Sequence, residues 1–462
     1  MRILALLLCW LLAVGIGAQA YQPQVNRDYI DITAKIIGSA LVEEKAYDRL
    51  SYLCDRIGHR LSGSQQLDQA IEWALTTMKT DGLENVHSEP VMVPHWVRGA
   101  ESAEVIAPVQ HNLSILGLGG TIGTPPEGIA GEVVVVKSYE QLDALGAAVK
   151  GKIVLYNVAM RSDIEPGRAY GEAVQYRTNG ASRAAKHGAV AMLLRSVTTR
   201  SLRTPHTGAM RYAPDVAQIP AAAVTIEDAE LIDRLVARGE KVIVQLKLGA
   251  KTLPDAKSAN VIAEWRGRER PEEIVLICGH LDSWDVGTGA TDDGSGCIMA
   301  MEAARILAKL NMRPRRTIRV VLFTNEENGL RGAFAYRDAH RQEIDKHIAA
   351  IECDAGADRP VGFSFSGTDR AFATIEQIAP LLKGLRADRN TRGGGGADIS
   401  PLIELGVPGL GLRPQQEHYF DLHHTEADTM DKIDRQALSL NVATLAVMTY
   451  MLADLPEPLA RQ

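Results

Sequence analysis

The chain places an imidazole and several carboxylates directly after an apolar run. Residues 273–278, Glu-Ile-Val-Leu-Ile-Cys, are typical of a buried strand, and His280, Asp282 and Asp292 follow them. Ionisable side chains at the end of a buried strand need a partner, because burying them unpaired is costly. Neutral imidazole and carboxylate oxygen are both ligands of zinc. The segment is therefore a candidate metal-binding segment, although a histidine near an acid is also common in ordinary loops.

Two later apolar runs also end in acidic residues, and a loop near the C-terminus adds two imidazoles. The residues concerned are Glu326, Glu327, Asp354, His423 and His424. Two histidines and three carboxylates are too many ligands for one tetrahedral zinc. They suit two metals that share a bridging carboxylate.

The elements that must position these residues alternate between strand and helix. The strand-like runs are 273–278, 317–323 and 347–351, and the segments 296–310 and 330–340 between them have helical patterns. This alternation is typical of a parallel sheet with crossover helices. In such sheets, sites form beyond the carboxyl ends of the strands. We therefore predict an α/β fold, with a mostly parallel sheet, helices on both faces, and the candidate ligands together at one edge.

Taken together, these motifs resemble those of the co-catalytic double-zinc exopeptidases. That family includes secreted bacterial aminopeptidases and the carboxypeptidase Q group, and the resemblance is strongest to this group. Residues 58–64, Gly-His-Arg-Leu-Ser-Gly-Ser, and 428–430, Asp-Thr-Met, extend the match. It covers essentially the whole mature chain, with several motifs in the right order.

The resemblance implies two zinc ions per chain, with Asp292 bridging them. The terminal ligands that it implies are His280, Glu327, Asp354 and His424. It favours His424 over His423 because His424 begins the family's His-Thr-x-x-Asp-Thr pattern. His423 is then expected to lie behind the ligands or to serve structure.

The resemblance also assigns chemical roles. It implies that Glu326 is the general base, which takes a proton from the attacking water and returns it to the leaving amine. Asp282 is expected to accept the second ring N–H of His280 and so fix its tautomer. The Asp292–Asp293 peptide is a candidate cis bond. Tyr419 is expected to line the substrate site, either as a wall or through its hydroxyl group.

Composition places the protein among ordinary globular proteins. The 462 residues are 46% hydrophobic and 23% charged, enough for more than one domain, and the net charge of −7 does not suggest a nucleic-acid partner. Residues 1–20 have the basic start, apolar run and small-residue cleavage site of a signal peptide. We expect cleavage after Ala20 and an exported protein, periplasmic or extracellular, without a stable membrane anchor.

A change of character along the chain predicts an inserted domain. We expect the peptidase domain to comprise residues 21–107 and 254–462, interrupted by a turn-rich and strand-rich block, 108–253. That block resembles a protease-associated domain and contains no candidate ligand, so it is expected to shape access to the site. The glycines of 393–396 are expected to let backbone approach the site closely.

The four cysteines beyond the predicted signal peptide are not dense enough for a disulfide scaffold. They are Cys54, Cys278, Cys297 and Cys353. Cys278 and Cys353 lie on predicted core strands beside the ligands, where small buried apolar side chains are a better interpretation than metal thiolates. The sequence does not decide whether any of the four forms a disulfide.

Three functions remain open at this stage. The preferred one is an exopeptidase of the carboxypeptidase or dipeptidase type that acts on short peptides. An aminopeptidase on the same scaffold is the alternative, because the metal motifs do not say which terminus is held. A receptor-like binding module is remote, because every ligand position and Glu326 are filled. The family resemblance further implies a homodimer.

Overall fold

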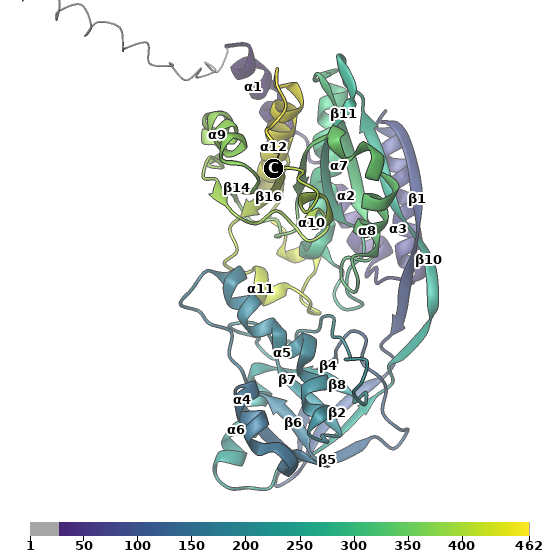
Figure 1. Cartoon of the computed structure of the whole chain (residues 1–462), viewed down its shortest axis with the longest axis vertical. Coiled ribbons are helices and arrows are strands. Elements are labelled where there is room, and N and C mark those ends of the chain that lie inside the picture. Colours follow the sequence, from purple (N-terminus) through teal and green to yellow (C-terminus); the bar gives the residue numbers. More distant parts are fainter. Residues whose placement is uncertain (1–26, 462) are drawn as a thin grey trace, which may run out of the picture.

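A computed structural model describes residues 27–461, so the predicted signal peptide, residues 1–20, lies outside the described residues. The chain forms two lobes, each built on an eight-stranded sheet (Figure 1). We call residues 27–97 and 251–461 the first lobe and residues 101–248 the second lobe. All the candidate ligands belong to the first lobe.

The sheet of the first lobe is mixed. In spatial order its strands are β1 (Glu84–Val97), β10 (Lys251–Trp265), β12 (Arg316–Phe323), β11 (Arg270–His280), β13 (His347–Glu352), β16 (Gly409–Pro414), β14 (Pro360–Ser366) and β15 (Thr391–Arg392). The central strands β12, β11, β13 and β16 are parallel, as is the short β14–β15 pair. The β1–β10, β10–β12 and β14–β16 pairs are antiparallel. The prediction of a mostly parallel sheet therefore holds only at its centre.

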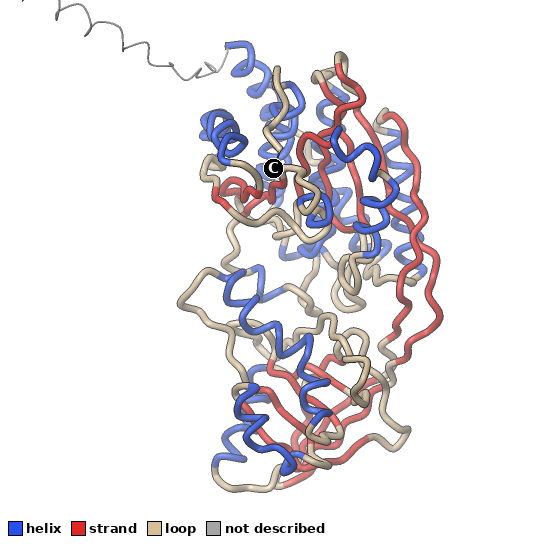
Figure 2. Tube along the Cα trace, in the orientation of Figure 1, coloured by secondary structure: helices blue, strands red, loops and turns tan. Residues whose placement is uncertain are grey.

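The antiparallel pairing of β1 with β10 follows from the topology of the chain, which hydrophobic periodicity does not reveal. Strands β1 and β10 form a long two-stranded ribbon that leads into the second lobe and back, so they must run in opposite directions (Figure 2). At their far end Trp96 pairs with Thr252. Hydrophobic periodicity indicates that a segment is a strand, but it does not give the strand's direction or its partner.

Helices cover both faces of the first-lobe sheet, as predicted. Their bounds are α1 (Arg27–Val42), α2 (Lys45–Tyr52), α3 (Gln65–Thr80), α7 (Ser295–Lys309), α8 (Arg331–Ala339), α9 (Asp369–Ile378), α10 (Ser400–Ile403), α11 (Tyr419–Leu422) and α12 (Arg435–Asp454). Alternate residues of β11 point to opposite faces, as the strand period requires. Val275 and Ile277 join the core under α7 and α12, whereas Leu276 and Cys278 join the core under α8 and α10.

Helix α12 is the central helix of the larger core. It is long and apolar enough to cross a membrane, yet 83% of its apolar window is buried inside the protein. Asp434 caps its first turn, where the carboxylate accepts a hydrogen bond from the backbone N–H of Ala437 at 2.6 Å. Its apolar surface is thus used for packing against α7 and α1.

The second lobe has its own sheet and two cores. Its strands, in spatial order, are β3 (His111–Leu113), β2 (Glu101–Ala107), β9 (Ile243–Leu248), β5 (Ile129–Val136), β6 (Ile153–Tyr156), β7 (Ala191–Arg195), β8 (Ala221–Val224) and β4 (Ile115–Gly117). Its helices are α4 (Tyr139–Leu145), α5 (Pro166–Lys186) and α6 (Ile226–Ala237). Helices α4 and α5 pack on one face and α6 packs on the other. In Figure 1, α5 and α11 lie where the two lobes meet.

The four cysteines among the described residues are buried and carry free thiols. They are Cys54, Cys278, Cys297 and Cys353. Burial raises the pKa of the Cys278 thiol well above its usual value, so it stays protonated. Cys278 and Cys353 are buried, with exposures of 0% and 3%, which agrees with their interpretation as small buried side chains.

Candidate metal centre

The central parallel strands deliver ionisable residues to one edge of the first-lobe sheet. His280 is the last residue of β11, Glu326 and Glu327 follow β12 in a tight turn, and Asp354 lies two residues beyond β13. These three strands are adjacent and parallel, so their carboxyl ends meet. The predicted clustering of these residues at one edge is therefore present.

Two further residues reach the same edge from irregular segments. Asp292 lies in a kinked segment, Ala290–Gly294, just before α7, where its own backbone angles are not helical, and the Asp292–Asp293 peptide is cis, as predicted. His424 lies in the loop after α11. Its φ of +62° is in the left-handed region that non-glycine residues rarely adopt. The sequence could place His424 only through the family pattern, since a loop has no period.

Asp292 lies between two sets of side chains. Its Oδ1 is 3.2 Å from Nε2 of His280, which is also 3.7 Å from Oδ1 of Asp354. Its Oδ2 is 3.3 Å from Nε2 of His424, which is 3.1 Å from Oε2 of Glu327. One carboxylate therefore directs one oxygen to each set, as a carboxylate that bridges two cations must do.

His423 is the competing imidazole. Its Nε2 lies 3.6 Å from Oδ2 of Asp292, and its ring stacks on that of His424 with centroids 3.5 Å apart. His424 contacts both Asp292 and Glu327, whereas His423 has only the Asp292 contact among these pairs. Burial, together with the charge on His424, holds the pKa of His423 well below its usual value. The contacts favour His424 as the ligand and leave His423 packed behind it.

The residues present fit a pair of zinc ions. Nε2 of His280 and Oδ2 of Asp292 are buried and make no hydrogen bond within the described residues. Ligand atoms of His280, Asp292 and Asp354 lie within 4.8 Å of one another, and so do those of Asp292, His423 and His424. Buried polar atoms without partners are costly, and imidazole nitrogen with carboxylate oxygen is a donor set that zinc accepts.

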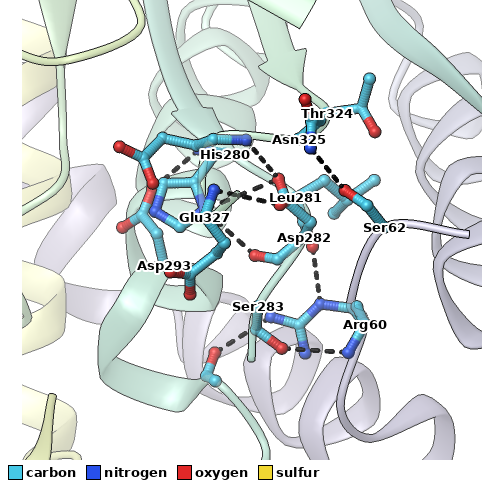
Figure 3. A network of polar contacts seen from close by, with 12 residues as sticks. Arg60, Ser62, His280, Leu281, Asp282, Ser283, Asp293, Thr324, Asn325 and Glu327 are labelled. Atoms are coloured by element: carbon cyan, nitrogen blue, oxygen red, sulfur yellow. Dashed lines mark hydrogen bonds and ion pairs between the residues drawn. The ribbon is translucent and has the colours of Figure 1, made fainter. Parts of the chain in front are cut away.

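Asp282 organises the turn that carries the two glutamates. It is fully buried, and its carboxylate accepts hydrogen bonds from the backbone N–H groups of Glu326 at 3.1 Å and Glu327 at 3.3 Å (Figure 3). Nδ1 of His280 lies 3.1 Å from the backbone oxygen of Asp282 but 3.9 Å from its carboxylate. The expectation that the Asp282 carboxylate accepts the His280 ring N–H is therefore corrected. The carbonyl oxygen takes that role, because the carboxylate faces the turn after β12.

Two other carboxylates hold the segment around Asp292. Asp428 accepts hydrogen bonds from the backbone N–H groups of Thr291 at 2.7 Å and Asp292 at 3.0 Å. Asp293 accepts one from the N–H of His280 at 3.0 Å. Burial raises the pKa of Asp428 to about 6, although these N–H donors oppose the shift. The family motif flagged Asp428, but only the structure shows that it fixes the bridging residue.

Arg60 ties the N-terminal motif to the loop that follows β11. Its guanidinium is fully buried and donates to the carbonyl oxygen of Leu281 at 2.7 Å (Figure 3). It also donates to the carbonyl oxygens of Gly58 at 2.8 Å, Thr288 at 2.8 Å and Gly289 at 3.1 Å. A hydrogen bond whose donor is charged, as the guanidinium is, is stronger than one between neutral groups. The Gly-His-Arg motif thus sets the shape of the loop between His280 and Asp292.

Glu326 lines a cavity between the lobes. The cavity measures about 300 Å³, and its walls include Trp96 and Met210. Burial, reinforced by the negative charges of Asp354 and Glu327, raises the pKa of Glu326 well above its usual value, against the opposing charge of His280. Cations bound at Asp292 would reverse this balance. A carboxylate beside such a cavity and the candidate ligands is placed to exchange protons there.

Tyr419 lies at the other side of the site. It is 8% exposed, and its hydroxyl group lies 3.5 Å from Oδ1 of Asp354, at the limit of a hydrogen bond. It also lines a pocket with Thr291 and Gly356. Both roles expected from the sequence, wall and hydroxyl donor, remain compatible with this position.

A buried acidic pair escaped the sequence analysis. Glu352, at the end of β13, is 1% exposed, and burial together with the charge of Asp354 raises its pKa to about 7. Asp398 is fully buried, and neither of its carboxylate oxygens has a hydrogen-bond partner within the described residues. A Cβ on Gly396 would overlap the Glu352 carboxyl group, so the predicted close approach of the glycine run is present. The only sequence feature that could have indicated this acidic pair is the position of Glu352 at the end of a predicted strand, two residues before Asp354.

Comparison with known proteins identifies the family to which the chain belongs. Residues 260–449 match peptidase family M28. Carboxypeptidase Q from Bos taurus is 44% identical over 442 residues, covering 96% of this chain and 91% of that protein. The crystal structure of a peptidase M28 precursor from Shewanella amazonensis SB2B has a TM-score of 0.91 at 36% identity, and the match covers 94% of this chain and 98% of that one. The chain belongs to peptidase family M28.

A more distant neighbour supports the fold alone. The zinc aminopeptidase BSAP from Bacillus subtilis has a TM-score of 0.66 at 20% identity, covering 90% of this chain and 99% of that one. The family is one of peptidases, so the chain is a hydrolase of peptide bonds, as predicted. The recognition of the zinc exopeptidase family and of its carboxypeptidase Q group is confirmed.

Proposed function

We propose that the protein is an exported, zinc-dependent exopeptidase that hydrolyses dipeptides or short peptides. The observation that carries the proposal is the position of Asp292. Its two oxygens approach two separate sets of ligand atoms, one with His280 and Asp354 and one with His424 and Glu327. Full-length similarity to carboxypeptidase Q supports the same class of activity.

The proposed centre holds two zinc ions per chain. Asp292 bridges them, and the terminal ligands are His280, Glu327, Asp354 and His424. When bound, such ions lower the pKa of a shared water and polarise the substrate carbonyl group. Asp282 and Asp428 position the ligands through backbone hydrogen bonds rather than by binding metal.

Glu326 is the proposed general base. It lines the cavity beside Glu327, and its backbone N–H is fixed by Asp282. It takes the proton of the attacking water and later delivers it to the leaving amine. Trp96 and Met210 give the cavity apolar walls, which exclude water and accommodate an apolar side chain of the substrate.

A second cleft favours recognition of a free carboxyl terminus. This cleft measures about 840 Å³, and its lining residues include Asp354, Arg392 and Arg413. Guanidinium groups match a carboxylate in geometry and charge. Arg392 is already paired with Asp369 at 2.7 Å, whereas the one side-chain hydrogen bond of Arg413 within residues 27–461 goes to the carbonyl oxygen of Arg389 at 3.3 Å. Arg413 is therefore the better candidate for a substrate carboxylate.

The aminopeptidase alternative rests on the same metal centre. The fold of the zinc aminopeptidase from Bacillus subtilis is similar, and the acidic residues around Asp354 suit an ammonium group. A receptor-like binding module is disfavoured, because all five proposed ligands and Glu326 converge. Hydrolysis restored by zinc in chelator-treated protein would exclude that third possibility.

One experiment separates the first two functions. The purified protein is treated with chelator, reloaded with zinc, and given four substrates: a free dipeptide, its N-acetyl form, its C-terminal amide, and an aminoacyl anilide. A carboxypeptidase or dipeptidase cleaves the free dipeptide and loses activity on the amide, and Arg413→Gln raises KM for the free dipeptide. Cleavage of the amide and the anilide with similar kcat/KM would establish an aminopeptidase. Glu326→Gln is the inactive control.

The remaining proposals concern organisation. The sequence predicts residues 21–107 and 254–462 as the peptidase domain and residues 108–253 as an inserted domain of the protease-associated type. Because β2, Glu101–Ala107, pairs with β3 and β9, we propose the second lobe, residues 101–248, as that inserted domain. The separate sheet and cores of the second lobe support that division. Removal of residues 1–20, release as a soluble exported protein and homodimer formation rest on the signal-like sequence and on family resemblance. Mass spectrometry of the secreted protein and light scattering test them.

A further inference from the structure

The loop that carries His424 is attached to the second lobe. The backbone N–H of Thr207 donates to the carbonyl oxygen of His424 at 3.0 Å, and Nδ1 of His424 lies 3.3 Å from the carbonyl oxygen of Thr207. Next to this pair, Nδ1 of His206 lies 2.9 Å from the carbonyl oxygen of His423. The second lobe therefore contacts the ring of a proposed ligand directly, in addition to bordering the cleft.

Thr207 is itself held firmly. It is 1% exposed, and its hydroxyl group donates to the carbonyl oxygen of Gly117 at 2.8 Å. His206 is 2% exposed, and its backbone N–H donates to the hydroxyl group of Ser196 at 3.0 Å. Both anchors, Gly117 and Ser196, belong to the second lobe, so the carbonyl group that faces His424 is fixed by that lobe.

Arg177, on α5, braces the same segment. Its Nε donates to the carbonyl oxygen of Ala209 at 3.2 Å and its Nη1 to that of Thr207 at 3.5 Å, the outer limit of a hydrogen bond. Nη1 also donates to the hydroxyl group of Tyr170 at 2.6 Å and lies 3.3 Å from Nδ1 of His424. The intervening Gly208 has φ of +135°, and a Cβ there would overlap the guanidinium. Glycine at 208 is what lets the arginine reach both carbonyl groups.

The left-handed φ of His424 explains why such support is needed. A non-glycine residue at φ +62° is rarely stable without surrounding contacts that hold it. Nε2 of the ring faces Asp292 and Glu327, and to bind a metal through Nε2 the neutral ring must carry its proton on Nδ1. The Thr207 carbonyl oxygen is the acceptor that this tautomer needs, as outer-shell partners supply for metal-binding histidines. With the proton on Nδ1, Nη1 of Arg177 donates to the Tyr170 hydroxyl group and the Thr207 carbonyl oxygen and not to the ring.

We propose that the second lobe is part of the metal centre, with Thr207 and Arg177 as positioning residues for His424. The carbonyl oxygen of Thr207 accepts the Nδ1–H of His424, and Arg177 holds that carbonyl group in place. This inference rests on the proposed metal centre and revises the sequence-based expectation that the second lobe only shapes access. It predicts that changes in the second lobe selectively weaken one of two metal sites.

The test measures zinc affinity in the purified full chain by competition with a chromophoric chelator. Arg177→Met is expected to weaken one of the two zinc equivalents by about 10–100-fold, the usual effect of losing an outer-shell partner. The other equivalent should keep its wild-type affinity, because His280 and Asp354 do not contact the second lobe in this way. Gly208→Ala should weaken the same equivalent, and Arg177→Lys should weaken it less than Arg177→Met.

The matched control is Arg200→Met. Arg200 also connects the lobes, through Asp421 at 2.8 Å and His418 at 2.7 Å, but it does not contact His424. Unchanged zinc binding in Arg200→Met, beside the loss in Arg177→Met, supports the proposal. The proposal is overturned if both Arg177→Met and Gly208→Ala bind two zinc ions as tightly as wild type. It is equally overturned if Arg200→Met weakens the same equivalent as strongly, since the cause would then be general loosening between the lobes.

Melting temperatures of the metal-free variants separate local loss from unfolding. If Arg177→Met fails to fold, Gly208→Ala and Arg177→Lys decide the question by the same titration. Failure of the metal centre itself would appear in the wild-type titration, as fewer than two zinc equivalents, before any variant is compared. Failure of the positioning role would appear only in the variants.

Discussion

Replacing Asp282 with asparagine tests how the turn after β12 is held. The Asp282 carboxylate is fully buried and accepts two backbone N–H groups, from Glu326 and Glu327. Asparagine keeps one acceptor oxygen but turns its NH₂ group toward the other N–H. The variant therefore loses one hydrogen bond to a charged group, roughly 1.5–3 kcal/mol, and leaves a buried donor unsatisfied, roughly 1–3 kcal/mol.

The expected consequences are a less stable protein and a misplaced base. We expect unfolding to become easier by about 2–4 kcal/mol, since the two losses partly overlap. Because a displacement of about 1 Å in a catalytic group can cost ~100-fold, kcat should fall by about 10–100-fold. KM should change little, because the apolar walls of the cavity, Trp96 and Met210, are untouched.

The assay compares kcat, KM and urea unfolding of Asp282→Asn with those of wild type and Asp285→Asn. Asp285 lies in the same loop and pairs with Arg98, but it does not contact the turn that carries Glu326. The control should keep kcat close to wild type. If Asp282→Asn had wild-type kcat and wild-type stability, the role given to this carboxylate would be wrong.

Three further predictions follow from the same contacts. Glu326→Gln should keep both zinc ions and lower kcat by about 10²–10⁴-fold, whereas Glu327→Gln should lose zinc. Metal analysis and kinetics of both variants check these roles, and full zinc occupancy in Glu327→Gln would show that Glu327 is not a ligand. Arg60→Met removes the hydrogen-bond donors of four carbonyl groups. The free energy of unfolding, measured in urea, should therefore fall by more than about 4 kcal/mol. A loss below about 1 kcal/mol would show that Arg60 does not hold the loop after β11. Burial lowers the pKa of His424, but Glu327 and Asp292 outweigh this effect and raise it to about 10 in the metal-free protein. The proton on His424 therefore competes with zinc, and the apparent zinc affinity should rise with pH by up to tenfold per unit from about 7 to 10. A zinc affinity that does not change with pH would refute this competition.

Much of the first lobe could be predicted because its signals are local. The start of α3, for example, is a local signal, since the Ser64 side chain caps the helix and accepts a hydrogen bond from the backbone N–H of Leu67. The buried runs of β11, β12 and β13 were recognisable by their apolar residues, and their shared direction placed His280, Glu327 and Asp354 together. What escaped prediction depends on contacts across the sheet or between lobes.

Asp282 illustrates that limit. Spacing placed it beside His280, but only the fold shows that its carboxylate faces the neighbouring turn while its carbonyl group faces the ring. Glu352 and Asp398 are far apart in sequence, and both are buried where Gly396 lets the backbone pass against the Glu352 carboxyl group. Contact between Thr207 and His424 joins residues separated by 217 positions, a pairing that neither composition nor periodicity encodes.

The central claim is that Asp292 bridges two metals in a peptidase site. The most direct test is an anomalous difference map, collected at the zinc absorption edge, from crystals of the zinc-loaded protein. We predict two peaks, one contacted by His280 and Asp354 and the other by His424 and Glu327, with one Asp292 oxygen directed to each. A single peak, or a second peak bound through His423 with His424 turned away, would contradict the account.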